Sequence, residues 1–256
     1  MSRTAEVEYL LDGLAQNIRN DGRRCDEARD MHVEFDVVPS ANSSCRVSRV
    51  NETEVIVAIK AELSAPLVHS PSAGIVKFSC EFSSLTIEES SIEDIVNDYI
   101  LSNFNREQLC VYDATLAWTL NIDCLVESSS GSLLDAIALA LRLSLSSLVL
   151  PKVLVHPAEE AGERPRVSFD ESTLEGVDIS TVPLSLTLGL RGDRAFVDPS
   201  HLEEKVASST DGLVVVFVKT DGVCCGVRKL GDAAVDAELL PGLISLAQNL
   251  VARIVL

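Results

Sequence analysis

The most constraining feature of the sequence is a segment, Leu133–Leu145, in which apolar residues cover nearly the whole circumference of a helix. Gly131 and Ser132 come just before it, and Ser132 offers an N-cap that predicts where this helix begins. A helix without a polar face has to be covered on every side, so we expect it to lie between sheet layers. Asp135 and Arg142 within the apolar stretch make a buried helix a better interpretation than a membrane span.

Around this helix, several segments show the two-residue period of half-buried β-strands. The strand-like segments are 31–37, 55–63, 75–82, 115–126, 184–190, 213–218 and 223–228. The dipeptide Asp221-Gly222 predicts a tight hairpin between the last two. Further helices are expected over 4–18, 90–104 and within 235–254. Two blocks of strands, each closed by a buried helix, predict an α+β fold of two similar lobes.

Four ranges describe the domain organisation that we expect. Glu159, Glu160, Gly162 and Pro165 crowd one segment, a composition typical of a surface loop or linker. The expected ranges are 1–30 for an N-terminal helix and arm, 31–156 for the first lobe, 157–181 for the loop or linker, and 182–256 for the second lobe.

Length and charge bound the possible functions. The chain has 256 residues, enough for one large domain or two small ones with a buried core. It carries 21 Lys and Arg against 39 Asp and Glu, a formal net charge of −18. A protein that binds nucleic acid by itself needs a basic surface, because it must neutralise phosphates. The charge therefore disfavours a free-standing nucleic-acid-binding protein.

Sequence patterns for several other chemistries are missing. The first 20 residues lack the uninterrupted apolar core of a signal peptide, so we expect the chain to stay inside the cell. The seven cysteines include no Cys-x-x-Cys pair, which favours reduced thiols. The four histidines have no metal-ligand spacing, and neither glycine-rich phosphate-binding motif occurs, so no metal or cofactor is expected. The serine runs 128–130 and 144–147 lack the surroundings of a catalytic nucleophile.

Five motifs, taken in order and at their spacing, closely resemble the RNase PH family. They cover the chain from about Tyr9 to Ile254. The motifs are Asn17–Arg23 with Asp26, Glu27 and Arg29; Glu54–Glu62; Gly131–Ala136; Val197-Asp198-Pro199 with Glu203-Glu204; and Gly226–Gly231. Each motif is weak evidence alone, but the ordered series is strong.

The resemblance implies a fold and an assembly. The implied fold is RNase PH-like, with two stacked βαβ-type lobes, mixed sheets and buried helices. Such chains pair and then form a six-membered ring around an RNA channel, which also carries RNA-binding cap proteins and a hydrolytic nuclease. The long opening helix and the Gly-Ser-Leu-Leu-Asp-Ala run look like exosome subunits of the class called ribosomal RNA-processing protein 42. That class implies a location in the nucleus, including the nucleolus, and in the cytoplasm.

The same resemblance implies that the active site is degenerate. Active members cleave RNA from its 3′ end with phosphate, and they hold this phosphate with an Arg-containing triplet at the start of the buried helix. Here Leu133 stands in that triplet and cannot bind an anion. The family's carboxylate pair corresponds to Glu204 and to either Thr210 or Asp211. Without the resemblance, the adjacent Glu203 and Glu204 favour a solvated helix start.

The basic RNA track also looks lost. Related non-catalytic members lend arginines from the helix corresponding to 92–101, where this chain has Asp94 and Asp98. Residues 81–127 hold ten acidic residues and one basic residue, a net charge of −9. We therefore expect a non-catalytic structural subunit of the eukaryotic RNA exosome ring, which supports 3′-to-5′ RNA processing and degradation by other subunits. RNA would pass through the ring with weak or no binding to the isolated chain.

Two alternatives stay open. The first is an active phosphate-dependent 3′-to-5′ exoribonuclease, which would use Glu204 and Asp211 together with a partner's arginines. The second is a ring subunit that grips RNA without cleaving it. The arginines considered for that grip are Arg19, Arg23, Arg24 and Arg106, which otherwise are solvated or paired with nearby carboxylates.

Overall fold

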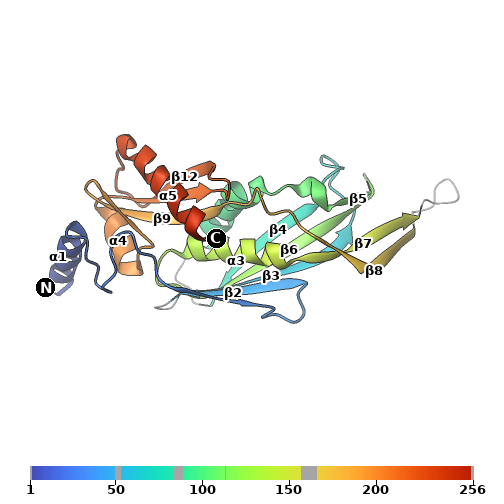
Figure 1. Ribbon diagram of the computed structural model, residues 1–256, viewed down its shortest axis with the longest axis horizontal. Coiled ribbons are helices and arrows are strands. Elements are labelled where there is room, and N and C mark those ends of the chain that lie inside the picture. The colour runs from blue at the N-terminus through green and yellow to red at the C-terminus, as the bar shows by residue number, and fades with distance from the viewer. Residues whose placement is uncertain (1, 50–52, 84–88, 113, 157–165, 255–256) are drawn as a thin grey trace.

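A computed structural model describes residues 2–49, 53–83, 89–112, 114–156 and 166–254. The molecule is elongated, with a helix lying between two main sheets (Figure 1). None of the described helices is long and apolar enough to cross a membrane. The α-helices are α1 (Ser2–Ala15), α2 (Glu89–Ile95), α3 (Leu133–Ser147), α4 (His201–Ser209) and α5 (Leu240–Ile254). The strands are β1 (Met31–Phe35), β2 (Ser43–Arg49), β3 (Thr53–Ser64), β4 (Ile75–Phe82), β5 (Cys110–Tyr112), β6 (Leu116–Ser128), β7 (Val149–His156), β8 (Arg166–Gly176), β9 (Leu184–Arg191), β10 (Arg194–Val197), β11 (Leu213–Val218) and β12 (Cys224–Leu230).

The first sheet has the order β1-β2-β3-β6-β4, and the short β5 also pairs with β6. Only the β4–β6 pair is parallel among the described pairs of this sheet. In β6, the alternating apolar residues Leu120, Ile122, Cys124 and Val126 are buried, whereas Asp123 between them is exposed. The two-residue period is therefore confirmed as the signature of a half-buried strand.

Helix α3 lies between the two sheets, as its apolar circumference predicts. It contacts β2 and β3 of the first sheet and β9 of the second. Ser132 stands at the predicted N-cap position of α3, but its backbone is left-handed, with φ of 51°, and its side chain makes no capping bond. Ser132 Oγ instead donates to the carbonyl of Pro199 in the second lobe at 3.1 Å. Contact between the lobes therefore sets the start of this helix.

The second sheet has the order β10-β9-β11-β12, with antiparallel neighbours. Its strand β11 is buried on both faces. Val214, Val216 and Val218 belong to a core that includes α5, whereas Val215 and Phe217 join the core around α3. This double burial explains why β11 reads as a continuous apolar run.

The expected helix over 90–104 is not one α-helix. Helix α2 ends at Ile95, a π-helical turn follows over Val96–Ile100, and a 3₁₀ turn comes after it. Within the π-helical turn, the ring of Tyr99 stacks on Phe217 of β11 with 4.7 Å between ring centroids. The segment thus departs from the predicted α-helical period at the place where Tyr99 packs on the second lobe.

The segment 157–181 is not a loop throughout. Its residues Arg166–Gly176 form β8, which pairs antiparallel with β7 in a two-stranded sheet of its own. Residues 157–165 lie outside the described residues. The sequence pattern failed here because its polar and Pro/Gly signals come mostly from 157–165, whereas β8 depends on its partner strand.

Candidate functional site at the lobe junction

A buried aspartate joins segments that are far apart in the chain. Asp198 follows β10, and its side chain is 3% exposed. Its Oδ1 accepts from Arg29 Nη2 at 2.7 Å and from Arg49 Nη1 at 2.6 Å. Its Oδ2 accepts from Arg29 Nε at 2.9 Å and from Arg23 Nη1 at 3.1 Å. Burial raises the pKa of Asp198, but the bonds and charges of Arg29 and Arg49 outweigh it and bring the pKa to about 2. Asp198 is therefore an ionised anchor.

A second buried ion pair lies beside this anchor. Arg19 Nε donates to Glu203 Oε1 at 2.9 Å, and its Nη2 donates to Oε2 of the same carboxylate. The Arg19 side chain has no exposed surface, and it also donates to the carbonyls of Val197 and Asp198 at 2.8 Å. Glu203 closes a capping box at the start of α4 by accepting from the backbone N–H of Ser200. The solvated helix start suggested by the adjacent glutamates is therefore wrong for Glu203, because Arg19 pairs with it.

The loop before α3 is packed tightly against the segment before α4. Gly131 has a φ of 107°, and a Cβ there would lie 2.3 Å from the carbonyl oxygen of Pro199. Only glycine fits this close approach. Thr53 Oγ1 and Arg29 Nη2 both donate to the Gly131 carbonyl, at 3.2 and 3.1 Å. The N-terminus of α3 therefore faces α4.

A carboxyl group of the chain itself binds at this helix N-terminus. Glu204 of α4 accepts the backbone N–H of Ser132 through Oε1 at 2.7 Å. The unpaired N–H groups at a helix start attract anions, and here an internal carboxyl group takes that place. Burial raises the pKa of Glu204 to about 7; Asp135 and Asp198 add to the rise, while Ser132 and Arg29 oppose it. Near neutral pH both protonation states of Glu204 are populated.

Glu204 borders a cavity of about 300 Å³. Half of its lining residues are apolar, and the titratable ones among the described residues are Glu204 and His201. No lysine or arginine is among the described residues that line it. The lining residues are Ser91, Ile92, Ile95, Ser129, Leu133, Leu134, Thr187, His201, Glu204 and Leu230. Because phosphate binding needs cations or free N–H donors, this lining is poorly suited to an anion.

One further buried carboxyl group links α3 to the second sheet. Asp135 is 4% exposed and accepts from the backbone N–H and the hydroxyl of Thr187, both at 2.9 Å. It also accepts from Ser185 Oγ at 3.2 Å. Burial raises the pKa of Asp135 to about 6, against the opposing charge of Arg49. Its partners lie on β9, so these bonds hold the two lobes together.

The residues predicted to form the degenerate active site do not all lie together. Leu133 and Glu204 line the same cavity, as their assignment to one site requires. Asp211 does not line it: its carboxylate pairs with Arg191 at 3.1 Å and accepts from the backbone N–H of Gly192. The two carboxylates assigned to the family pair therefore have separate partners in this chain.

The four arginines considered for RNA contact differ in exposure. Arg19 is buried in its ion pair, and the Arg23 side chain is 13% exposed and bonded to Asp198. Arg24 is 63% exposed with a carboxylate neighbour at 3.4 Å, and Arg106 is half-buried in a 3₁₀ turn. The geometry gives Arg19 and Arg23 structural roles and leaves Arg24 the most accessible of the four.

Sequence reasoning missed the central place of Asp198 and the participation of Arg49. Asp198 and Arg29 did stand in the family-like motifs, which was the available signal. Nothing in the sequence paired them, because 169 residues separate Arg29 from Asp198 and 149 separate Arg49 from it.

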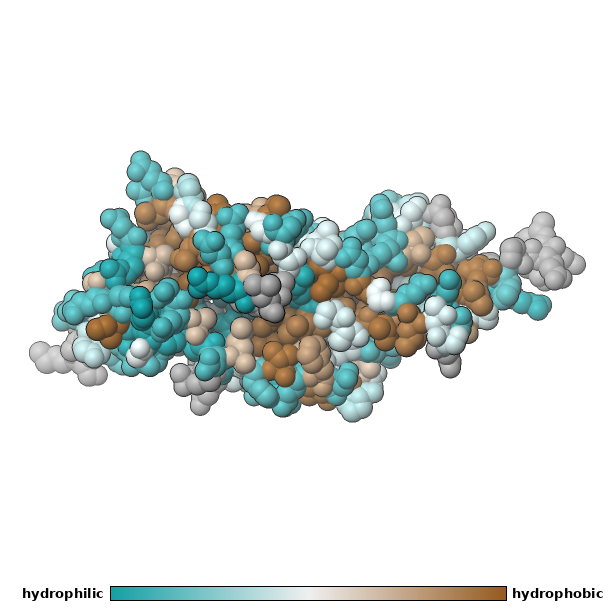
Figure 2. Space-filling model, viewed as in Figure 1, coloured by the Kyte–Doolittle hydropathy of each residue, from teal (hydrophilic) through white to brown (hydrophobic). Residues whose placement is uncertain are grey.

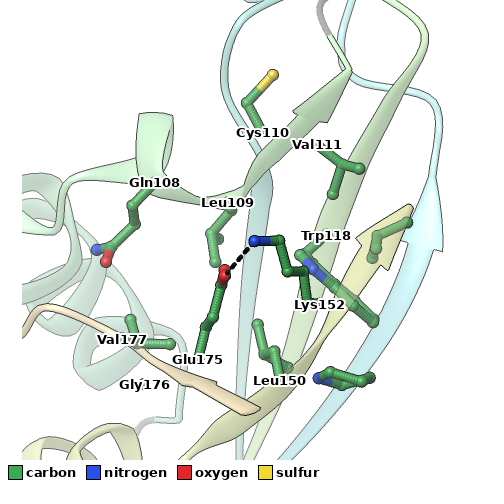
Figure 3. Close-up of a pocket in the computed structure, with 12 residues that line it drawn as sticks. Gln108, Leu109, Cys110, Val111, Trp118, Leu150, Lys152, Glu175, Gly176 and Val177 are labelled. Atoms are coloured by element: carbon green, nitrogen blue, oxygen red, sulfur yellow. Dashed lines mark ion pairs between the residues drawn. The ribbon is translucent and has the colours of Figure 1, made fainter. Parts of the chain in front are cut away.

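A second cavity, of about 230 Å³, lies between β5 and the β7–β8 hairpin (Figure 3). Lys152 Nζ and Glu175 Oε1 face each other there at 3.9 Å, with half or more of each side chain exposed. The wall includes apolar residues such as Trp118 and Leu150. An exposed ion pair contributes little binding energy, so the cavity at α3 is the stronger candidate site.

Solved structures identify the class of fold. The archaeal exosome core matches this chain with a TM-score of 0.79 at 24% sequence identity, covering 98% of this chain and 95% of the other. An Archaeoglobus fulgidus exosome with RNA bound to its active site matches with a TM-score of 0.80 at 22% identity, covering 98% and 96%. The chain thus has the two-lobed α+β fold of exosome core subunits, as the sequence predicted.

Sequence comparisons identify the family. The model of the 3′ exoribonuclease family, domain 1, matches residues 27–151. The exosome complex component Rrp42 of Thermococcus kodakarensis is 30% identical over 234 residues, 87% of this chain and 82% of the relative. The exosome complex component rrp43 of Schizosaccharomyces pombe is 26% identical over 254 residues, 94% of this chain and 91% of the relative. The chain belongs to the RNase PH family of 3′ exoribonucleases, which confirms the resemblance in its motifs.

Proposed function

We propose that this chain is a non-catalytic structural subunit of the RNA exosome core ring. It would support 3′-to-5′ RNA processing and degradation, including ribosomal RNA maturation, that other subunits carry out. The similarity to exosome components named Rrp42 and Rrp43 supports a place in such a ring. We further propose a eukaryotic ring that works in the nucleus, including the nucleolus, and in the cytoplasm.

The observation that carries the non-catalytic role is the position of Glu204. Phosphorolysis needs an inorganic phosphate held by cations and N–H donors beside the RNA 3′ end. In this chain the Ser132 N–H at the helix start is bonded to Glu204, and the neighbouring Leu133 is apolar. An ionised Glu204 would also repel phosphate at short range.

The arginines near the site are bonded to groups of this chain. Arg29 and Arg49 bond to Asp198, and Arg19 bonds to Glu203. Moving Arg19 onto phosphate would leave the buried Glu203 without its arginine, and moving Arg29 or Arg49 would take one of the arginines from Asp198, so each move has a cost in free energy. The active-nuclease alternative gains no support from Asp211, because that carboxylate pairs with Arg191.

Other RNase PH-like chains are the proposed direct partners, with RNA-binding cap proteins as further ones. Figure 2 shows apolar side chains at the end of the molecule where the β7–β8 hairpin lies. Five exposed large apolar residues belong to this hairpin: Val149, Leu154, Val167, Phe169 and Leu174. A protein surface that gathers such residues is typical of a contact with another protein. A neighbouring ring subunit would cover them.

The direct test is a phosphorolysis assay on the purified chain. We expect no release of nucleoside diphosphate from single-stranded RNA with inorganic phosphate, because the Ser132 N–H is occupied and no cation lines the described cavity. The variants Glu204→Ala and Asp211→Asn are measured in parallel, since each removes one carboxylate but only the first lines the cavity. Phosphate-dependent release that disappears in Glu204→Ala would contradict the proposal, and its loss in Asp211→Asn as well would favour the active-nuclease alternative.

A further inference from the structure

The cavity beside Glu204 combines an apolar wall with a carboxyl group that is only partly bonded. Ile92, Leu133 and Leu230 contribute to the wall. Glu204 Oε1 accepts from Ser132, whereas Oε2 has no hydrogen bond to any residue that the structure describes. A carboxylate can accept bonds at both oxygens. One oxygen is therefore available to a ligand in the cavity.

The charges that face Glu204 favour a cation over an anion. Asp135 on α3 and Asp198 after β10 are acidic, while Arg29, before β1, is bonded to Asp198 and to nearby backbone carbonyls. His201 on α4 is the other titratable lining residue. The described lining residues of α2, β9 and β12 have no charged side chain. Glu204 is thus an acidic group without a counter-ion bonded to it.

We propose that this cavity binds a primary ammonium group carried on a short aliphatic stem, with Glu204 as its counter-ion. The ammonium donates to Glu204 Oε2, and the hydroxyls of Ser129 and Thr187 in the same lining offer further acceptor lone pairs. The stem lies against Leu133 and the other apolar side chains. A volume of about 300 Å³ is in the range of small-ligand sites. The inference rests on the proposed function in one respect, namely that phosphate does not occupy the cavity.

Binding of such a cation is linked to the protonation of Glu204. Burial raises the pKa of this carboxyl group to about 7, so part of it is protonated in the free protein at neutral pH. A bound ammonium favours the ionised carboxylate, so binding releases a proton and strengthens as the pH rises. Between pH 6 and pH 8 the ionised fraction of such a group rises about tenfold, and the affinity should rise by the same factor.

Two sources could supply this chemistry, a free aliphatic amine or a lysine side chain of a protein. The probes are therefore n-butylamine and a blocked lysine, Nα-acetyl-lysine methylamide, each compared with its uncharged counterpart, n-butanol or the norleucine analogue. Calorimetric titration of the purified chain measures both the affinity and the protons released. Binding of both amines indicates a site open to lysine side chains, and binding of butylamine alone indicates a free amine as the ligand.

The variants separate the site from the general acidity of the chain. Glu204→Gln keeps the acceptor for Ser132 but removes the charge, and it should weaken amine binding at least tenfold. Asp94→Asn removes the same charge from an exposed position on the neighbouring α2, and it should change the affinity less than twofold. His201→Gln should keep the pH dependence, because that dependence belongs to Glu204.

Three results would overturn the inference: no binding of either amine, equal binding of the uncharged counterparts, or equal weakening by Glu204→Gln and Asp94→Asn. A parallel titration with inorganic phosphate keeps the two proposals apart. Phosphate that binds and displaces butylamine would contradict the proposed function as well. Absence of binding by phosphate and by both amines would refute this inference and leave the non-catalytic role standing.

Discussion

Replacing Asp198 with asparagine tests whether the buried anchor holds the lobes together. The substitution keeps the size and one acceptor oxygen of the side chain but removes its charge. Arg29 and Arg49 then lose the carboxylate that bonds them at 2.6–2.9 Å. Both arginines remain buried, with 3% and 7% of their side chains exposed. The variant therefore leaves positive charge in the interior without its partner.

The magnitude follows from this burial. Removing one member of a buried ion pair costs about 3–5 kcal/mol of unfolding free energy. For a chain of this length, that corresponds to a fall in melting temperature of roughly 10 °C or more. The matched control is Asp211→Asn, which removes the same group from the partly exposed pair with Arg191. We expect that control to cost below about 1 kcal/mol, because water screens the pair.

The pH dependence of stability gives a second, independent value for the contribution of Asp198 to the free energy of unfolding. The pKa of Asp198 is about 2 in the folded chain, against its ordinary value of 3.8. The ionised form therefore contributes stability that is fully present above pH 3.8 and is lost as the pH falls toward 2. About 1.4 kcal/mol per pH unit makes this contribution roughly 2.5 kcal/mol. The difference between wild type and Asp198→Asn should shrink by most of that amount between pH 4 and pH 2.

Urea unfolding measures these differences, with two probes that report on different parts of the molecule. Fluorescence of Trp118, the single tryptophan, follows the first sheet, while far-UV circular dichroism follows both lobes. If the anchor couples the lobes, both probes should shift together in Asp198→Asn. The reasoning would be refuted if Asp198→Asn cost no more than Asp211→Asn, or if its effect stayed constant down to pH 2.

Three further predictions follow from the site and the surface. Glu204→Gln should stabilise the chain by about 3 kcal/mol at pH 8 and hardly at pH 4.5, because the folded chain holds a proton on Glu204 up to about pH 7 whereas the unfolded chain releases it near 4.5. Urea unfolding at both pH values measures this difference in stability, and equal differences at the two pH values would contradict the assigned burial. Co-expression with an RNase PH-like partner should raise the melting temperature and the solubility of the chain. A stable monomer whose melting temperature no ring partner raises would count against the proposed assembly. In the heterodimer, changing Asp94 and Asp98 to Arg should strengthen RNA binding and steepen its salt dependence by up to about 0.7 per new phosphate contact; both residues are exposed, so the fold should tolerate the change, and an unaltered affinity would mean that this helix faces away from RNA.

Local patterns predicted seven of the twelve described strands, because burial imposes its period within a few residues, but they did not predict β2, β5, β7, β8, β10 or the helix α4. The alternating segments of β3 and β6 and the apolar α3 each carry their own signal. The exceptions depend on distant partners. The left-handed Ser132 is fixed by Pro199 and Glu204, and β8 becomes a strand by pairing with β7.

The site was predicted in part for the same reason. The resemblance brought Leu133 and Glu204 to one place, because family spacing carries long-range information that periodicity lacks. Arg19 was considered as an RNA contact because no local feature reveals a partner 184 residues away. Arg19 is buried in its pair with Glu203, and only the folded chain brings the two residues together.

The distance along the chain between Asp198 and its arginines affects the order of folding. A ribosome that adds about 5–20 residues per second needs roughly 7–30 s to reach Asp198 after it has made Arg49, which lies 149 residues earlier. Until then Arg29 and Arg49 have no Asp198 to bond, and the second sheet lacks its strands β11 and β12. We therefore expect a nascent chain that stops before residue 198 to remain a substrate for chaperones, because buried arginines of the first lobe still lack their carboxylate partner.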